Sequence, residues 1–294
     1  MTPAPDRTAV LAVLALTVNA FTWGLLWWPF RWFAAQGLHP LWATVAVYGV
    51  VVVLISVWRP RAWGQLLRAP VLWWLLLAAG VTNAAYNTAA TLGDVVRAVL
   101  LFYLMPLWSV LLARLVLGER LTLLAALRVV LALGGAMIVL WPADGSGWPL
   151  PRSAADALAV LGGFGFALNN VLLRREAARS DESRALAMFL GGLLVPAVAA
   201  LALGAAGLVA PPPAAAPGWV AGVVALAVVF LVGNLALQYG AARLPANATS
   251  VVMVSEVVFA AGSAVALGAG VLTSQMGAGG ALILAAALLA AWRR

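Results

Sequence analysis

The chain has 294 residues, of which 65% are hydrophobic and 9% are charged, with a mean hydropathy of +1.05. Soluble globular domains carry roughly a quarter charged residues, so this composition excludes such a domain and indicates a protein whose solvent is the bilayer. All 17 basic residues are Arg, and the net charge is +8; in a membrane protein this excess is explained by topology signals and not by nucleic-acid binding.

Apolar runs of the length needed to cross a bilayer, about 20 residues each, follow one another along the whole chain. They predict ten transmembrane helices at 8–32, 40–58, 71–91, 95–117, 122–141, 154–175, 185–208, 217–241, 246–269 and 275–292. The first run is longer than the core of a cleavable signal, and no A-x-A site follows it. The long polar, Gly/Pro-rich segment from Trp141 to Pro149 lies between the two halves.

The arginines indicate how these helices cross the membrane. If the N-terminus is cytoplasmic, fourteen of the 17 arginines lie on the inner side, and Arg31, Arg97 and Arg152 lie outside. This asymmetry follows the positive-inside rule. We therefore expect a multi-pass protein of the inner (cytoplasmic) membrane with both termini in the cytoplasm.

The second half repeats the plan of the first. A shift of 151 residues places Asn83 on Asn234 and Trp141 on Trp292, and every apolar run and break keeps its place. The predicted fold is all-α, with one five-helix repeat at 1–147 and a second at 148–294. Because five is odd, the repeats have opposite orientations, as in secondary transporters with a central midplane cavity, although channels also contain such repeats.

Polar side chains at membrane depth need a partner or water. Asn83 and Tyr86 share a face of the third predicted helix, and Asn234 and Gln238 reproduce the spacing of Asn83 and Asn87 in the eighth. These amides could line one polar pocket, or they could join helices to one another. The other amides in predicted helices are Asn19, Asn169 and Asn170.

Four aromatic residues lie deeper than the many Trp residues near predicted helix ends. Trp23, Tyr86, Tyr103 and Phe166 could line a site for a planar ligand, or fill the space between helices. Glu256, a carboxylate well inside a predicted helix, could couple transport to protons or play a structural role. His39, the only His, is expected in a solvated loop.

Enzyme functions are excluded by the residue inventory. The sequence has no Cys, no Lys, no H-E-x-x-H motif and no paired carboxylates within a predicted helix. A disulfide framework, a thiolate nucleophile, a Cys-ligated metal and a lysine phosphate loop are therefore impossible. We expect no catalytic residue, no metal and no cofactor.

Several motifs resemble the drug/metabolite transporter superfamily in its ten-helix, EamA-type branch. They are Trp23-Gly24, Met105-Pro106-Leu107-Trp108, Leu117-Gly118-Glu119-Arg120-Leu121-Thr122, the run from Phe166 to Arg175, and Ser255-Glu256-Val257-Val258-Phe259. The aromatic character resembles the YddG-type exporters of aromatic amino acids. In the second half, Ala269-Gly270-Val271 stands where the first half has Gly-Glu-Arg.

The resemblance implies ten helices around a central cavity and export of aromatic or other large neutral amino acids by alternating access. Another metabolite or drug remains an alternative substrate, and a channel or a membrane scaffold an alternative class. The partners would be a small-molecule substrate and the lipid bilayer, with a monomer as one possible state. The residues expected to bind substrate are Asn19, Trp23, Asn83, Tyr86, Tyr103, Phe166, Asn170, Asn234 and Gln238.

Overall fold

The computed structural model describes residues 7–118, 122–141, 150–176, 178–241, 243 and 246–291, and within these ranges it contains helices and connecting turns but no strand. The all-α fold is thus confirmed. The helices are α1 (Arg7–Gly24), α2 (Trp27–Ala35), α3 (Pro40–Trp58), α4 (Arg61–Leu67), α5 (Val71–Leu92), α6 (Val95–Phe102), α7 (Met105–Leu117), α8 (Leu123–Leu140), α9 (Ala154–Arg175), α10 (Asp181–Ala205), α11 (Pro217–Ala241), α12 (Ala246–Ala266) and α13 (Ser274–Ala291).

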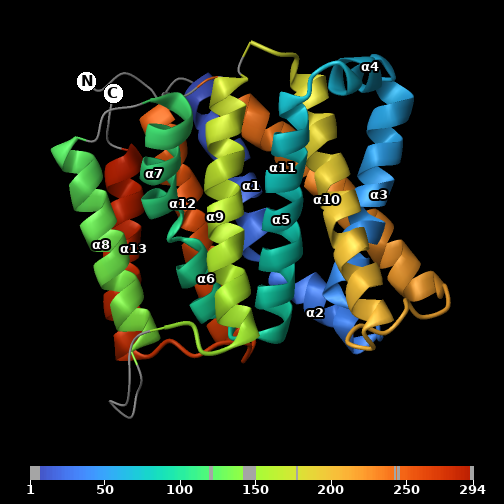
Figure 1. The fold of residues 1–294 in the computed structure, drawn as a ribbon. Helices are drawn as coiled ribbons and strands as arrows, with labels where there is room; N and C mark the ends of the chain where they lie inside the picture. The colour runs from blue at the N-terminus through green and yellow to red at the C-terminus, as the bar shows by residue number, and fades with distance from the viewer. Residues whose placement is uncertain are drawn as a thin grey trace.

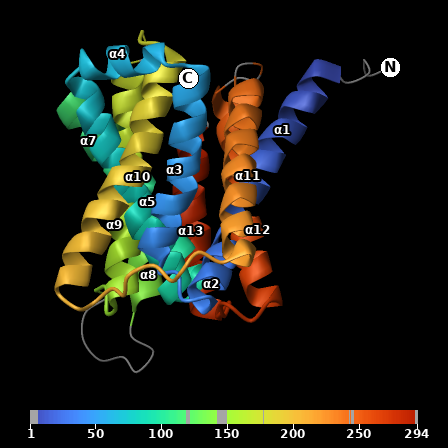
Figure 2. The same cartoon turned by 90° about the vertical axis from the view of Figure 1, so that its right-hand side faces the viewer.

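The long helices form one bundle, with the short helices α4 and α2 at opposite ends (Figures 1 and 2). We call these the α4 end and the α2 end. Helix α1 begins and α13 ends at the α4 end, while the turns from α5 to α6 and from α12 to α13 lie at the α2 end (Figure 1). The chain thus starts and finishes the bundle on the same side.

Helices occupy every segment predicted from the apolar runs, but two of these segments are broken. The first is divided by a turn at Leu25 and Leu26, and the fourth by a turn at Tyr103 and Leu104. The second break has a chemical cause. Pro106 is the second residue of α7, where its missing N–H costs no helical bond, whereas inside a continuous helix it would cost one.

The lengths and hydropathies of the helices identify a multi-pass membrane protein. Six helical segments within the described residues are long and apolar enough to cross a membrane, or seven if the bent pair α4 and α5 counts as one. Shorter apolar helices lie at Ala126–Leu140, Ser255–Ala266 and Ser274–Ala286. The number of ten transmembrane helices stays a prediction.

The helix pairings recur between the two halves. Helix α1 packs against α11 and α12, and its counterpart α9 packs against α5 and α7. Helix α8 at Leu123–Leu140 packs against α13 at Ser274–Ala291, and the two coincide under the shift of 151 residues. Two repeats related by a pseudo-two-fold axis would pair in this way. Their proposed division lies in residues 142–149, outside the described residues.

Two glycine crossings hold opposite halves close together. An added Cβ on Gly135 of α8 would lie 2.5 Å from the Gly279 carbonyl oxygen, and one on Gly279 of α13 would lie 2.6 Å from the Gly135 carbonyl oxygen. Gly191 of α10 likewise meets the Leu76 carbonyl of α5. The paired glycines therefore allow close helix contacts inside the monomer, as small residues do in membrane bundles.

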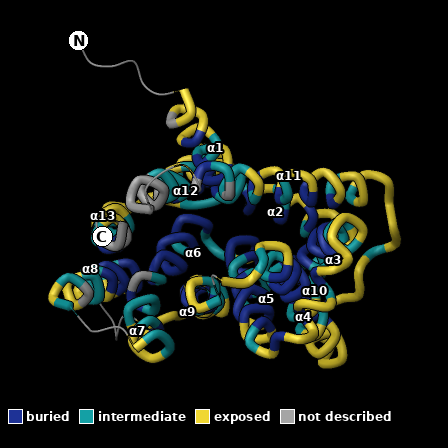
Figure 3. Tube along the Cα trace, turned by 90° about the horizontal axis from the view of Figure 1, so that it is seen from above, coloured by how far each residue is buried: buried dark blue, intermediate teal, exposed yellow. Residues whose placement is uncertain are grey.

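The outward faces of the bundle are apolar. Buried residues lie where helices meet, and exposed residues lie on the perimeter (Figure 3). Large apolar side chains are among the most exposed, for example Leu115 at 79% and Leu123 at 89%. A perimeter with such exposed apolar side chains is suited to the hydrocarbon core of a bilayer and not to water.

One local expectation was only partly right. His39 lies in the loop before α3, but it is half-buried and not fully solvated, and its Nδ1 accepts a hydrogen bond from the Leu41 N–H at 3.2 Å, which caps α3. Asp181 and Glu182 form the first turn of α10 behind the N-cap residue Ser180. Acidic residues there interact favourably with the helix dipole.

Candidate functional site

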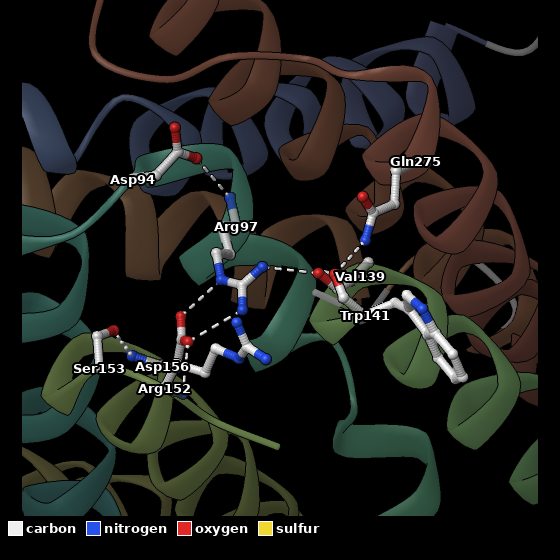
Figure 4. A network of polar contacts seen from close by, with 8 residues as sticks. All are labelled: Asp94, Arg97, Val139, Trp141, Arg152, Ser153, Asp156 and Gln275. Carbon is white, nitrogen blue, oxygen red and sulfur yellow. Dashed lines mark hydrogen bonds and ion pairs between the residues drawn. The ribbon is translucent and has the colours of Figure 1, made fainter. Parts of the chain in front are cut away.

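An ion pair at the α2 end joins the two halves of the chain. Nε and Nη2 of Arg97 in α6 donate to the two carboxylate oxygens of Asp156 in α9, at 2.7 and 3.0 Å (Figure 4). This is the bidentate geometry that makes arginine–carboxylate pairs strong. The side chains are 22% and 8% exposed, respectively, so the pair is largely shielded from water.

Helix caps fix both members of this pair. Asp94 caps α6 by accepting from the Arg97 N–H at 2.8 Å, and Ser153 caps α9 by accepting from the Asp156 N–H at 3.0 Å. Each charged side chain therefore projects from the first turn of a capped helix, where the backbone is well ordered. Asp156 also accepts from the backbone N–H of Arg152 at 3.1 Å.

Further polar contacts at the α2 end connect the short turns. Arg97 Nη1 donates to the Val139 carbonyl at 2.6 Å, and the second carboxylate oxygen of Asp94 accepts from the Val271 N–H at 3.0 Å. Gln275 donates from its amide nitrogen to the carbonyls of Ile138 and Trp141, both at 2.7 Å. Helices α6, α8, α9 and α13 are thus fastened together at one end of the bundle (Figure 4).

The three arginines expected on the outside all take part in this region. Arg31 of α2 donates to the Gly93 and Ala90 carbonyls at the end of α5, a favourable place for a cation. Arg97 and Arg152 contact Asp156. The exceptions to the positive-inside asymmetry therefore have a structural role.

A cavity of about 440 Å³ lies within this network. Charged side chains of both signs line it, from Asp94, Arg97, Arg152 and Asp156. In Figure 4 the guanidinium groups of Arg97 and Arg152 lie close to each other. The cavity lies at the α2 end and not at the middle of the bundle, where the sequence predicted the binding site.

Aromatic rings cluster further along α6, towards the middle of the bundle. The centroid of Phe102 lies 4.6 Å from that of Tyr86, 5.4 Å from that of Phe166 and 6.0 Å from that of Tyr103. Glycines of α9 allow this packing: an added Cβ on Gly163 would lie 2.4 Å from the Phe102 carbonyl oxygen. We call Tyr86, Phe102, Tyr103 and Phe166 the ring cluster.

Glu256 of α12 lies at the ring cluster. Its carboxyl group pairs with the Tyr103 hydroxyl through a side-chain hydrogen bond. The neighbouring residue Val257 packs with Tyr103 in the same apolar core. An acid and a tyrosine hydroxyl therefore form the polar part of an otherwise apolar site.

The fourth expected ring, Trp23, lies elsewhere. Its ring packs on Phe230 of α11, with centroids 4.9 Å apart, and Phe230 in turn contacts Tyr48 at 5.6 Å. Tyr48 donates its hydroxyl to the Asn83 side-chain oxygen. The structure thus divides the expected aromatic residues between two clusters.

Two of the amides expected to line one pocket, Asn19 and Asn83, make other contacts. Asn19 donates to the Gly233 carbonyl at 2.7 Å and so joins α1 to α11, while Asn83 donates to the Ala79 carbonyl at 2.8 Å and accepts from Tyr48. Both act as helix-to-helix ties, the alternative left open by the sequence. Asn170 is exposed on the outside of α9, and Asn234 is half-buried. The side chain of Gln238 lies outside the described residues.

Several residues of the site were not predicted from the sequence. Asp94 and Asp156 were not recognised as site residues, although a Gly-Asp break and a Ser153-x-x-Asp156 spacing before an apolar run are signals of helix N-termini. Trp27, one of the Trp residues near predicted helix ends, is buried and donates to the Ser263 hydroxyl at 3.0 Å, which the sequence did not indicate. No sequence signal distinguished Phe102 from the apolar residues around it.

Comparisons with known proteins agree with the fold. The model of the EamA-like transporter family matches residues 10–141, so the first half of the chain is similar to a family of membrane transporters. Fifteen chains of solved structures match. One of them, described only as "Crystal structure of protein", is 23% identical with a TM-score of 0.56 over 95% of this chain and 96% of its own. No curated protein matches the sequence.

Proposed function

We propose that this protein is a secondary transporter that exports aromatic or other large neutral amino acids across the cytoplasmic membrane by alternating access. The observation that carries the proposal is the polar closure at the α2 end, which joins the two halves of the chain just beyond the ring cluster and Glu256. A transporter needs such a removable barrier on one side of its substrate site. The family match over residues 10–141 supports transport of a small solute.

The barrier consists of contacts that can be exchanged for water. Arg97–Asp156 and Asp94–Val271 connect residues of the first half to residues of the second, and all four lie at or near the cavity. Movement of one half against the other would break these contacts together. The glycine crossing of α8 and α13 is a tight backbone contact about which the halves can pivot.

The route from this barrier to the proposed substrate site follows α6. This helix has eight residues and is therefore about 12 Å long. It begins beside Arg97 at the cavity and ends at Phe102, in the ring cluster. We place the substrate ring against Tyr86, Tyr103 and Phe166, where it would replace some of the ring contacts now made by Phe102.

Glu256 is the residue we assign to the polar part of the substrate or to a coupling proton. It pairs with Tyr103 among apolar residues, and intramembrane acids of this kind commonly mark ion pathways. Asn234 and Gln238 remain candidates for the substrate's carboxylate. Asn19 and Asn83 would first have to give up their helix-to-helix bonds to Gly233 and Tyr48, respectively.

The orientation follows from charge. The basic α4 end, with Arg59, Arg61 and Arg68, would face the cytoplasm, and the α2 end would face outward. In this orientation, the polar closure at the α2 end would lie on the outer side of the membrane. An exporter would load its substrate from the cytoplasm in this state.

The test is flux into proteoliposomes measured with a panel of labelled amino acids, with and without a pH gradient. We expect uptake of phenylalanine, tryptophan or leucine above that of protein-free vesicles, and loss of most of it in Tyr86→Ala. In Glu256→Gln, flux driven by the pH gradient should disappear if Glu256 carries the proton. Unchanged flux would rule out that role, and absence of flux for every neutral amino acid would rule out the proposed substrate class.

A further inference from the structure

Helix α4 lies across the bundle and not along it. The break at Arg68–Pro70 turns the chain by 104° between α4 and α5, and α4 covers the ends of neighbouring helices at the α4 end (Figures 1 and 2). Its buried face consists of Ala62 and Leu66, which are 2% and 0% exposed. This is the arrangement of an amphipathic helix lying in a membrane interface.

The opposite face of α4 presents two arginines around a depression. Arg61, the first residue of α4, and Arg68, which directly follows its last residue, are exposed and lie about 10 Å from one another along the helix axis. Between them lies a depression of about 520 Å³ that Gly64 and Gln65 also line. Gly64 has nothing within 4 Å of its missing Cβ, which leaves room for a ligand.

The arginines that line this depression differ from neighbouring arginines in whether an acidic side chain pairs with them. At this end of the bundle, Glu176 pairs with Arg175 and Arg179, Asp181 pairs with Arg184, and Glu182 pairs with Arg59. In the part of the chain that the structure describes, no acidic residue pairs with Arg61 or Arg68. The positive charge of these two side chains is therefore available to an anion.

The side chains that flank α4 indicate which kind of anion would bind. Exposed apolar side chains flank α4, among them Trp58 at 64%, Leu67 at 62% and Trp74 at 63%. Aromatic residues of this kind mark the boundary between hydrocarbon and head groups. A ligand in the depression would therefore have its charge at Arg61 and Arg68 and an apolar tail beside α3 and α5.

We infer that the α4 depression is a binding site for one anionic phospholipid, whose phosphodiester lies between Arg61 and Arg68. Gln65 contributes its amide nitrogen, because its side-chain oxygen already accepts from Ser180. Arginine is suited to phosphate because its donors match the phosphate oxygens. The site would fasten α4, and with it the junction of α3 and α5, to the inner leaflet. The inference depends on the membrane orientation and not on the transported substrate.

The experiment is native mass spectrometry of the full chain in detergent, titrated with phosphatidylglycerol or with phosphatidylcholine of the same acyl chains. For two charge-assisted contacts we expect about tenfold or greater preference for phosphatidylglycerol. Arg61→Gln/Arg68→Gln should remove this preference. Arg179→Gln/Arg184→Gln is the matched control, since it removes the same charge from the same end and should keep the preference.

A second variant distinguishes binding in the depression from attraction by the positive charge alone. Gly64→Leu fills the depression and keeps both arginines, and it should lower phosphatidylglycerol retention several-fold. Retention unchanged by Gly64→Leu, or equal binding of both lipids by the unmodified chain, would overturn the inference. So would equal competition by millimolar glycerol 3-phosphate, because the site would then recognise a soluble phosphate and not a lipid.

Discussion

Arg97 and Asp156 face each other across the two halves of the chain, with Nε and Nη2 of the arginine at 2.7 and 3.0 Å from the two carboxylate oxygens. This pair lies at the end of the bundle that carries few arginines. It also borders the 440 Å³ cavity. We therefore propose that Arg97–Asp156 is the main closure of the bundle at the α2 end.

Loss of this closure should be measurable by labelling. The chain has no Cys, so Ala98→Cys introduces a single reactive thiol beside the cavity at a site only 3% exposed. In proteoliposomes we expect slow reaction with a membrane-impermeant maleimide, and about tenfold faster reaction when Arg97→Ala is added. Removing one member of a shielded pair costs about 3–5 kcal/mol, more than a tenfold change requires.

Arg97→Lys is the control for this measurement, because it keeps the charge but loses the bidentate geometry. We expect an intermediate labelling rate. Equal rates for all three proteins would show that Arg97–Asp156 does not limit access from the α2 end.

The glycine crossing of α8 and α13 should tolerate no side chain. Gly135→Leu would push a side chain into the Gly279 carbonyl, 2.5 Å from the position of the added Cβ. Overpacking of this kind typically costs about 1–3 kcal/mol. The neighbouring substitution Gly134→Leu has its nearest contact at 3.9 Å and serves as the control. Thermal unfolding followed by size-exclusion chromatography should show a lower Tm for Gly135→Leu only, and equal values would contradict the crossing.

The cap on α6 gives a third prediction. Asp94→Ala removes the acceptor of the Arg97 N–H and the contact with Val271, and should destabilise the fold by at least about 1 kcal/mol. Asp94→Asn retains a capping oxygen, but its amide NH2 cannot accept from the Val271 N–H, so it should lose less than Asp94→Ala. The comparison of their Tm values separates the cap from the negative charge and the Val271 contact. A Tm for Asp94→Asn as low as that for Asp94→Ala would assign the effect to the charge and the Val271 contact and not to the cap.

His39 makes stability depend on pH. Burial lowers the pKa of His39, and its neutral ring accepts the Leu41 N–H at the start of α3. The folded state therefore binds this proton less readily than the unfolded state does, so stability should fall as the pH decreases below about 6.5, the ordinary pKa of histidine. His39→Asn caps without titrating, and its Tm should lack this part of the pH dependence. Parallel Tm curves from pH 7.5 to pH 5 would contradict the role of His39.

Much of the bundle could be predicted from the sequence because hydropathy and helix breakers act locally. The positions of the helices follow from the length of each apolar run, but the break at Tyr103 and Leu104, which the missing N–H of Pro106 explains, was not predicted. The match of α8 to α13 under a constant shift follows from the repeat. These features need no knowledge of which helices are neighbours.

The site was harder to predict because it depends on helix rotation and on distant pairings. Asn83 and Tyr86 share a helix face in the sequence, yet Asn83 contacts Tyr48 and Tyr86 contacts Phe102. Helix α5 is enclosed by α3, α9 and α10, so a rotation of 60° between two side chains is enough to direct them to different helices. Arg97 and Asp156 are 59 residues apart, and their charges alone do not reveal the pairing.

Alternating access by a carrier is tested most directly by counterflow. Proteoliposomes loaded with unlabelled phenylalanine are diluted into a trace of labelled phenylalanine, and internal label is followed with time. We predict a transient accumulation of label above equilibrium, reduced in Tyr86→Ala although this variant inserts normally. A monotonic approach to equilibrium would identify a channel, and label no higher than in protein-free vesicles for phenylalanine, tryptophan and leucine alike would contradict the proposed export of large neutral amino acids.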